Sequence, residues 1–81
     1  MSIKTICNLK EGEKGVIVSY NNDKIAGKLL SMGVLPGKTL RLIRRSLFGG
    51  GLYLKMEDHI IALRKDEANH IFIEEGKEEI I

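Results

Sequence analysis

The chain is poor in several residue types that would commit it to particular classes of protein. Its 81 residues include one cysteine, one proline and no tryptophan, with only two tyrosines and two phenylalanines. The single cysteine, Cys7, cannot form an internal disulfide, so we expect a reducing compartment. The longest apolar run, Ile60 to Leu63, is far short of the ~20 residues that cross a bilayer. The first residues also hold no apolar core of signal-peptide length. These absences predict a cytoplasmic protein with no segment inserted directly into a membrane.

Motifs for catalysis are also missing. No serine stands in a nucleophile-elbow context, no two carboxylates show a catalytic spacing, and His59 and His70 fall in separate predicted strands. The run Gly49-Gly50-Gly51 is not followed by the Lys-Ser/Thr pair of a phosphate-binding loop and is predicted to form a hairpin turn. We therefore predict no enzymatic activity and no cofactor.

Metal-binding spacing such as Cys-x-x-Cys or His-x-x-x-His does not occur either. The residues that could act as ligands are Cys7, Met32, Met56, Asp58, His59 and His70. Met32 and Met56 fall on apolar stripes, which favours a place in the core. His59, which follows Glu57-Asp58, is the weak candidate for an exposed metal site, and the sequence otherwise predicts none.

Charge is plentiful but nearly balanced. Thirteen Lys and Arg against eleven Asp and Glu give a formal net charge of +2. Residues 1–45 hold nine of the bases and three of the acids, whereas residues 46–81 hold four and eight. The two halves of a small barrel interleave, so a mixed, solvated surface is the favoured interpretation. The segment from Lys38 to Arg45 nevertheless predicts a basic strand.

The hydrophobic pattern predicts short strands around one short helix. Strands are expected over 3–7, 16–20, 38–47, 52–57, 59–63 and 70–73, with one helical turn over 65–69. In the third strand the alternation places Arg41 and Arg45 on one face with Ile43. A helix over 23–32 is expected after the capping residues Asn21-Asn22-Asp23, with Ile25, Leu29 and Met32 as its apolar stripe. The predicted core positions are Ile17, Leu29, Leu40, Leu42, Leu54, Ile61, Leu63 and Ile71.

Two segments carry specific backbone chemistry. Gly33 suits the left-handed position that ends a helix, while Pro36-Gly37 suits a type II turn. The segment Ile60–Ala68 reads as a strand that runs into a helical turn. Such elements within 81 residues predict a mainly β fold, a small closed or partly closed antiparallel barrel of five to six short strands with one short α-helix. Residues 1–75 form this single domain, and 76–81 are expected to be a C-terminal tail.

The positions of these residues resemble a known family. The resemblance runs over roughly residues 5–73 and rests on Leu9, Gly12, Ile17, Lys28-Leu29, Met32-Gly33-Val34-Leu35-Pro36-Gly37, Leu40, Leu42, Arg44, Gly49, Leu52, Leu54, Ala62-Leu63-Arg64, Glu67-Ala68 and Ile71. The pattern is similar to that of FeoA, ferrous iron transport protein A. It implies an SH3-like barrel with a cytoplasmic accessory role. The implied partner is the transporter FeoB, contacted on its cytosolic GTPase side, and this contact would place the protein at the periphery of the inner membrane.

Three positions depart from the family pattern. Leu47 and Gly51 stand where family members often have proline, so the intervening loop is expected to be more mobile. Lys28 stands where arginine is common, which keeps the charge and loses the bidentate fork. A related domain occurs in metal-dependent repressors, so a nucleic-acid-binding or metalloregulator-type role is the alternative, although nucleic acid is the less favoured partner.

A partner protein is expected to bind outward strand positions and the glycine loop. The candidates are an apolar anchor at Phe48 or Tyr53, surrounded by Arg41, Arg44 or Lys55. Lys28 could contribute from the helix, although a solvated lysine is the favoured interpretation. Six apolar residues have outward parity, and they could also support a homo-oligomer: Val16, Val18, Ile43, Tyr53, Ile60 and Phe72.

Overall fold

The computed structural model describes residues 3–75, and these residues form the predicted mainly β fold. Its elements in chain order are β1 (Ile3–Thr5), the 3-10 turn η1 (Ile6–Asn8), β2 (Lys14–Tyr20), α1 (Asp23–Ser31), β3 (Thr39–Arg45), β4 (Gly51–Lys55), β5 (Ile60–Arg64), α2 (Lys65–Ala68) and β6 (Ile71–Glu75). The predicted tail, 76–81, lies outside the described residues.

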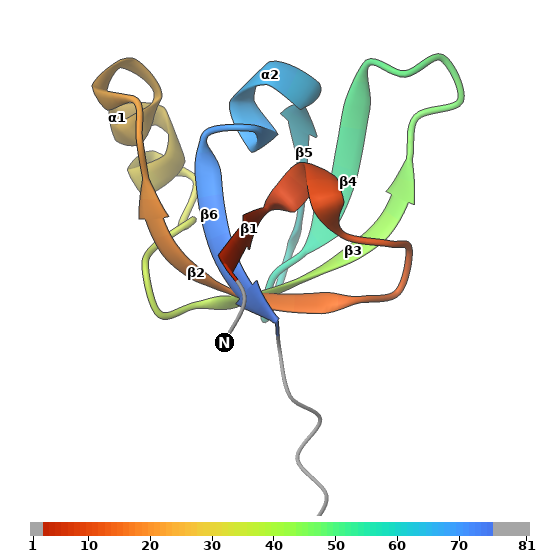
Figure 1. Ribbon diagram of the computed structural model, residues 1–81, viewed down its shortest axis with the longest axis horizontal. Helices are drawn as coiled ribbons and strands as arrows, with labels where there is room; N and C mark the ends of the chain where they lie inside the picture. Colours follow the sequence, from red (N-terminus) through yellow and green to blue (C-terminus); the bar gives the residue numbers. More distant parts are fainter. Residues whose placement is uncertain (1–2, 76–81) are drawn as a thin grey trace, which may run out of the picture.

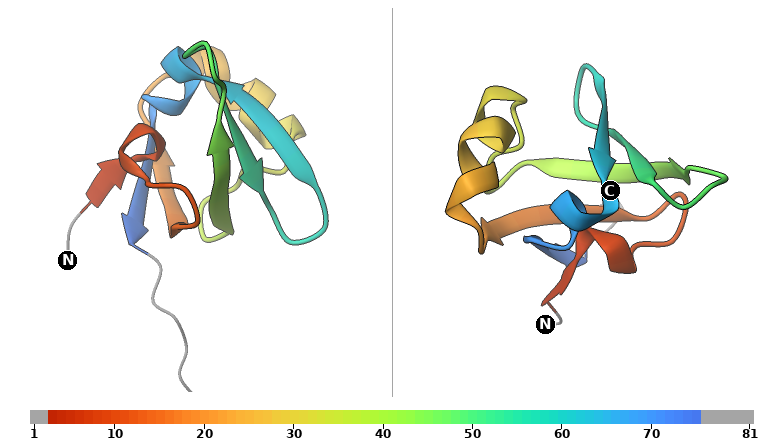
Figure 2. Two further views of the ribbon diagram at one scale, coloured as in Figure 1. Left: turned by 90° about the vertical axis from the view of Figure 1, so that its right-hand side faces the viewer. Right: turned by 90° about the horizontal axis from the view of Figure 1, so that it is seen from above.

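All six strands belong to one antiparallel sheet in the order β1-β6-β2-β3-β4-β5. The sheet curls round the core, as Figure 1 and Figure 2 show. The strands β1 and β5 are its two edges, so the barrel is partly closed, and η1 and α2 lie in contact with each other at the gap. Short edges covered by helical turns leave little unpaired backbone for aggregation.

The helix α1 begins and ends where its sequence chemistry predicts. The side chain of Asn22 accepts a hydrogen bond from the amide of Lys24 at 2.9 Å, which caps the first turn. At the other end Gly33 has φ +81°, and its amide donates to the carbonyl of Leu30. The amide of Val34 donates to the carbonyl of Leu29, which completes a Schellman motif. The side chains of Leu29 and Val34 are both buried in the core.

The core fills the inside of the curled sheet. All eight predicted core residues are buried, and none of them is more than 7% exposed. The cluster also contains Ile6, Leu9, Val34, Leu52, Met56, Ala68 and Ile73. Met56 is therefore core, as predicted, and Met32 is half-buried against it. With the interior filled by side chains, any functional chemistry of this domain must take place on its surface.

The prediction of a first strand over 3–7 is wrong at its end. The strand stops at Thr5, because the side chain of Asn8 accepts from both the amide and the hydroxyl of Thr5 at 3.1 Å and turns the chain. This turn buries Ile6 completely and places Cys7 on η1. The last strand extends further than predicted, since β6 pairs with β1 as far as Glu74 and with β2 as far as Glu75.

Candidate functional site

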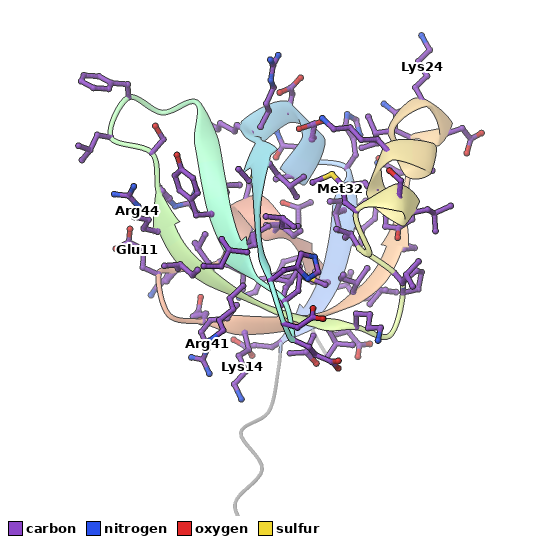
Figure 3. All side chains as sticks on the ribbon, turned by 180° about the vertical axis from the view of Figure 1, so that it is seen from behind. Glu11, Lys14, Lys24, Met32, Arg41 and Arg44 are labelled. Carbon is purple, nitrogen blue, oxygen red and sulfur yellow. The ribbon has the colours of Figure 1, made fainter. Side chains whose placement is uncertain are left out.

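Three basic residues lie directly opposite one another across the middle of the sheet. Lys14 of β2 is the register partner of Arg41 in β3, which in turn is the partner of Lys55 in β4. Residues paired in this way share one face, and Figure 3 shows Lys14 and Arg41 side by side. Between them lies an open depression of about 230 Å³, which Glu57 also lines. Like charges at opposed positions cost stability, so this row is not explained by folding.

A β-bulge then brings Arg44 onto the same face. The register shifts between Leu42 and Arg44, so that Arg44 pairs with Tyr53 and both Ile43 and Arg44 are exposed. The guanidinium carbon of Arg44 lies 5.0 Å from the centre of the Tyr53 ring, in cation–π range. The simple alternation that predicted Arg41 and Arg45 on one face is therefore wrong. The extra residue of the bulge reverses the parity of the strand.

The strand β5 continues this surface. Its exposed residues Ile60, Ala62 and Arg64 pair with Lys55, Tyr53 and Gly51, respectively. The strands β3, β4 and β5 contain no Asp or Glu. We call the resulting surface the cationic face; it consists of Lys14, Arg41, Arg44, Lys55 and Arg64 around the apolar residues Ile43, Tyr53 and Ile60. Four of the predicted partner-binding residues thus come together on one face.

The cations of this face have no acidic partners among residues 3–75. The ion pairs there involve Lys4, Lys28 and His59 instead. Arg41 does donate from Nη1 to the carbonyl of Gly12 at 2.6 Å, which ties its guanidinium to the turn before β2. The charges of the cationic face are therefore available to an anionic partner.

The predicted anchor Phe48 lies beside the cationic face and not within it. It is 95% exposed at the apex of the β3–β4 connection, next to Leu47, which is 89% exposed. The base of this loop is closed by the amide of Ser46, which donates to the carbonyl of Gly51 at 2.9 Å. Gly49 takes φ +76°, so the chain reverses in the predicted hairpin turn.

Two other basic residues are structural. The side chain of Lys28 is exposed, as the interpretation of a solvated lysine predicts, but its Nζ also lies 2.5 Å from Oε2 of Glu67, which is only 9% exposed. The other oxygen of Glu67 accepts from the amide of Arg64 at 2.9 Å. The hydrogen bond from Lys28 is the main cause that lowers the pKa of Glu67, and the hydrogen bond from the Arg64 amide is the second cause. This pair ties α1 to α2 and keeps the carboxylate charged.

Arg45 is the structural residue that the sequence did not single out. It pairs with the buried Leu52, so its side chain points to the inner side of the sheet. There its Nη2 donates to the carbonyls of Cys7 at 2.6 Å and of Leu9 at 2.7 Å. These contacts fix the chain on both sides of Asn8 against the end of β3. The alternation in the sequence placed Arg45 on the face of Arg41, and the bulge in β3 makes that assignment wrong.

His59, the weak metal candidate, uses both ring nitrogens within the protein. Its Nδ1 lies 2.8 Å from Oδ1 of Asp58, and its Nε2 lies 3.2 Å from the carbonyl of Met32. Both neighbours are acceptors, so only the imidazolium can donate to both. The bond with Asp58 and then that with Met32 raise the pKa of His59. His59 also lines a half-open depression of about 280 Å³ with Gly33, which is a concavity that the sequence did not predict.

The other possible ligands lie apart. Within the described part of the chain, no three His, Cys, Asp or Glu side chains gather as a metal site. The thiol of Cys7 lies 3.4 Å from the carbonyl of Lys65, and burial raises the pKa of Cys7 although Arg45 and Lys65 act in the opposite direction. The thiolate form that metals bind is thereby disfavoured. Also within residues 3–75, no helix has the length and apolar character needed to span a bilayer.

Comparisons with known proteins give one consistent result. A curated protein of Campylobacter jejuni subsp. jejuni, described as "Putative Fe(2+) transport protein A", is 35% identical over 68 residues, which are 83% of this chain and 92% of that protein. A FeoA-like protein from Clostridium acetobutylicum has a TM-score of 0.86 at 20% identity, and the match covers 100% of this chain and 95% of that one.

Two further solved structures show how widely this fold is used. The iron uptake regulatory protein FeoA matches with a TM-score of 0.81 at 21% identity, over 91% of this chain and 99% of that one. A manganese-dependent transcriptional repressor matches with a TM-score of 0.80 at 16% identity, over 88% of this chain and 40% of the repressor. The sequence model of the FeoA domain matches residues 4–75, and the chain belongs to the FeoA domain family.

Proposed function

We propose that this protein is a non-enzymatic, cytoplasmic accessory protein of ferrous iron transport that acts by contact with a FeoB-type membrane transporter. Membership of the FeoA family supports the connection to iron transport. The observation that carries the mode of action is the cationic face, where Arg41, Arg44 and Lys55 lie around Tyr53 and form no ion pair within residues 3–75. Tyrosine and arginine are enriched among the residues that contribute most to binding at protein interfaces, and the rims of such interfaces are polar.

The geometry favours an acidic surface on the partner. Arg44 stacked on Tyr53 offers a planar fork over an aromatic ring, which can pair with a carboxylate while the ring excludes water. The row Lys14–Arg41–Lys55 would lose its mutual repulsion when carboxylates lie against it. A partner with acidic residues thus gains contact energy and removes a cost that the free protein carries.

The test is binding to the immobilised cytosolic part of the companion transporter. We expect the double variant Arg44→Glu/Tyr53→Ala to lose at least about tenfold in affinity, as central anchors do. The control is Lys24→Glu, which reverses another exposed charge on α1, away from the cationic face (Figure 3). The double variant should also abolish transporter-dependent iron uptake. Wild-type affinity in a folded double variant would place the contact surface elsewhere.

The cationic face also keeps a second candidate open, namely nucleic-acid binding. The five cations of this face could follow a phosphate backbone. Against this, the face has one aromatic residue, Tyr53, and Arg44 already covers its ring. Titration with a labelled oligonucleotide at several salt concentrations separates the two. A steep fall of affinity with salt, together with tighter binding than to the transporter at physiological salt, would favour nucleic acid.

A further inference from the structure

The apex of the β3–β4 loop is the most unusual apolar feature of the described residues. Leu47 and Phe48 are adjacent, and they are 89% and 95% exposed. Exposed apolar side chains are ordinary when they are scattered, but two neighbours at the end of a loop form a convex apolar tip. The view from above in Figure 2 shows this loop projecting beyond the body of the molecule. Its apolar surface is therefore not shared with the core.

The apex offers hydrophobic contact without polar specificity. The residues that follow it are Gly49 and Gly50, so no polar side chain stands at the tip. Part of the loop backbone already has a hydrogen-bond partner, because the amide of Gly49 donates to the carbonyl of Ser46. A protein pocket normally combines an apolar anchor with a directional polar rim. This tip needs only an apolar medium that can close round a convex shape.

The charges round the base of the loop are mainly positive. Arg64 is the register partner of Gly51, and the amide of Lys65 lies 3.4 Å from the carbonyl of Gly50. Arg44 lies three residues before Leu47 on the same hairpin. The acids at this end are Glu11, which accepts from the amide of Arg45, and Asp66 and Glu67 on α2. Glu67 is already paired with Lys28, so the cations Arg44, Arg64 and Lys65 outnumber the remaining acids next to the apolar tip.

We propose that Leu47 and Phe48 insert into the interfacial region of an anionic phospholipid bilayer, while Arg44, Arg64 and Lys65 contact its phosphates. Stable attachment to a membrane surface takes two signals, and a short apolar tip beside a basic cluster supplies both. From the absence of long apolar runs we expected no direct insertion into a membrane. That argument considers only segments long enough to span the bilayer. Insertion of two side chains requires no such run.

This inference is separate from the proposed function, since it needs no transporter. If both hold, the bilayer would carry part of the binding and would keep the cationic face close to a membrane protein. Vesicles that contain no protein therefore test the inference alone.

The first experiment uses the lack of tryptophan in the chain. The variant Phe48→Trp carries a single reporter at the apex. With vesicles of phosphatidylethanolamine and phosphatidylglycerol we expect a blue shift of its emission and quenching by brominated lipids, and a much weaker response with phosphatidylcholine. The control is Ile60→Trp, an exposed position at the start of β5, at the end of that strand away from the loop. It should show neither effect.

The second experiment measures co-sedimentation with the same vesicles. We expect Leu47→Ser/Phe48→Ser to lower the bound fraction at least about tenfold, because two large apolar side chains no longer leave water. Lys65→Glu should lower it by about fivefold or more, since each surface cation contributes about that factor. Ile60→Ser is the matched control and should bind like the wild type. Circular dichroism verifies that each variant is folded.

Two results would overturn the proposal. One is the absence of binding to anionic vesicles at low salt by folded wild-type protein. The other is equal binding by the wild type and by Leu47→Ser/Phe48→Ser, which would leave the charges alone responsible. Neither result affects the transporter assay, in which the soluble cytosolic part is used without lipid, so failure of one proposal is distinguishable from failure of the other.

Discussion

Arg44 and Arg45 are neighbours in β3, but they serve opposite sides of the sheet. Arg45 points inward and donates to the carbonyls of Cys7 and Leu9. Arg44 points outward, stacks on Tyr53, and has no acidic partner among residues 3–75. The same contrast separates Lys28, which pairs with a buried glutamate, from Lys55, which faces Arg41. The molecule therefore uses one set of cations to hold its elements together and leaves another set available.

This difference predicts that changes which lower stability and changes which weaken the proposed partner contact fall on different residues. Changes to the inward cations and to the turn glycines should lower the free energy of unfolding. Changes to the cationic face should leave it nearly unchanged, or raise it, while affecting partner binding. The following predictions test that separation, from the largest expected effect to the smallest.

The two adjacent arginines give the sharpest test. Arg45→Met keeps the apolar stem but removes two hydrogen bonds from a charged donor, and we expect a loss of about 2–3 kcal/mol in the free energy of unfolding. Arg44→Met removes an exposed cation–π contact and should cost less than about 1 kcal/mol. Urea unfolding of both variants measures the difference. Equal losses would mean that the two side chains do not have the different roles assigned to them.

Gly33→Val tests the scaffold at the end of α1. A β-branched residue at φ +81° is strained, so we expect a loss of about 1–2 kcal/mol. Space does not limit the substitution, because a Cβ at this position would lie 3.7 Å from the His59 ring. The matched control is Gly27→Val, inside α1, where φ is not positive and nothing lies within 4 Å. Thermal melts that showed no loss for Gly33→Val would contradict the Schellman assignment.

Lys28→Met tests the pair between α1 and α2. Lys28 is 55% exposed, which limits the loss to about 1 kcal/mol near neutral pH. The folded protein lowers the pKa of Glu67 below its ordinary value of 4.5, so the contribution of this pair is present above that value and disappears as the pH falls through the folded-state pKa. Unfolding measured as a function of pH should therefore show wild type and variant converging in acid. Lys24→Met is the control, and its free energy of unfolding should match that of the wild type at every pH. A difference between Lys28→Met and the wild type that stays constant with pH would contradict the mechanism.

Lys55→Glu should have the opposite sign. It places a carboxylate opposite Arg41 and removes a like-charge contact, so we expect a gain of about 0.2–1 kcal/mol in stability. The same variant should bind the transporter more weakly, because the cationic face loses one charge and acquires an acid. A stabilised variant with reduced affinity would confirm the separation. Loss of stability would show that the row Lys14–Arg41–Lys55 already contributes to folding.

The sequence alone determined the parts of the structure that depend on local chemistry. The capping residues at Asn22, the stop at Gly33 and the hairpin glycines specify their own backbone conformations. The alternation of the strands and the apolar stripe of the helix identified all eight predicted core positions. The family was also recognisable, because its residues are spread over nearly the whole chain. These signals are local, or they are read position by position, so no partner in space is needed to interpret them.

Only the tertiary structure decided which charges are available. The bulge in β3 reverses the alternation of inward and outward side chains, so Arg45 points inward and Arg44 outward. No residue type in that strand indicates the bulge. Register places Lys14, Arg41 and Lys55 in one row, although they come from three strands. The role of Lys28 depended on Glu67, which follows 39 residues later. Charge is a property of single residues, whereas neutralisation depends on pairs, and such pairs form only when the sheet and the helices bring distant segments together.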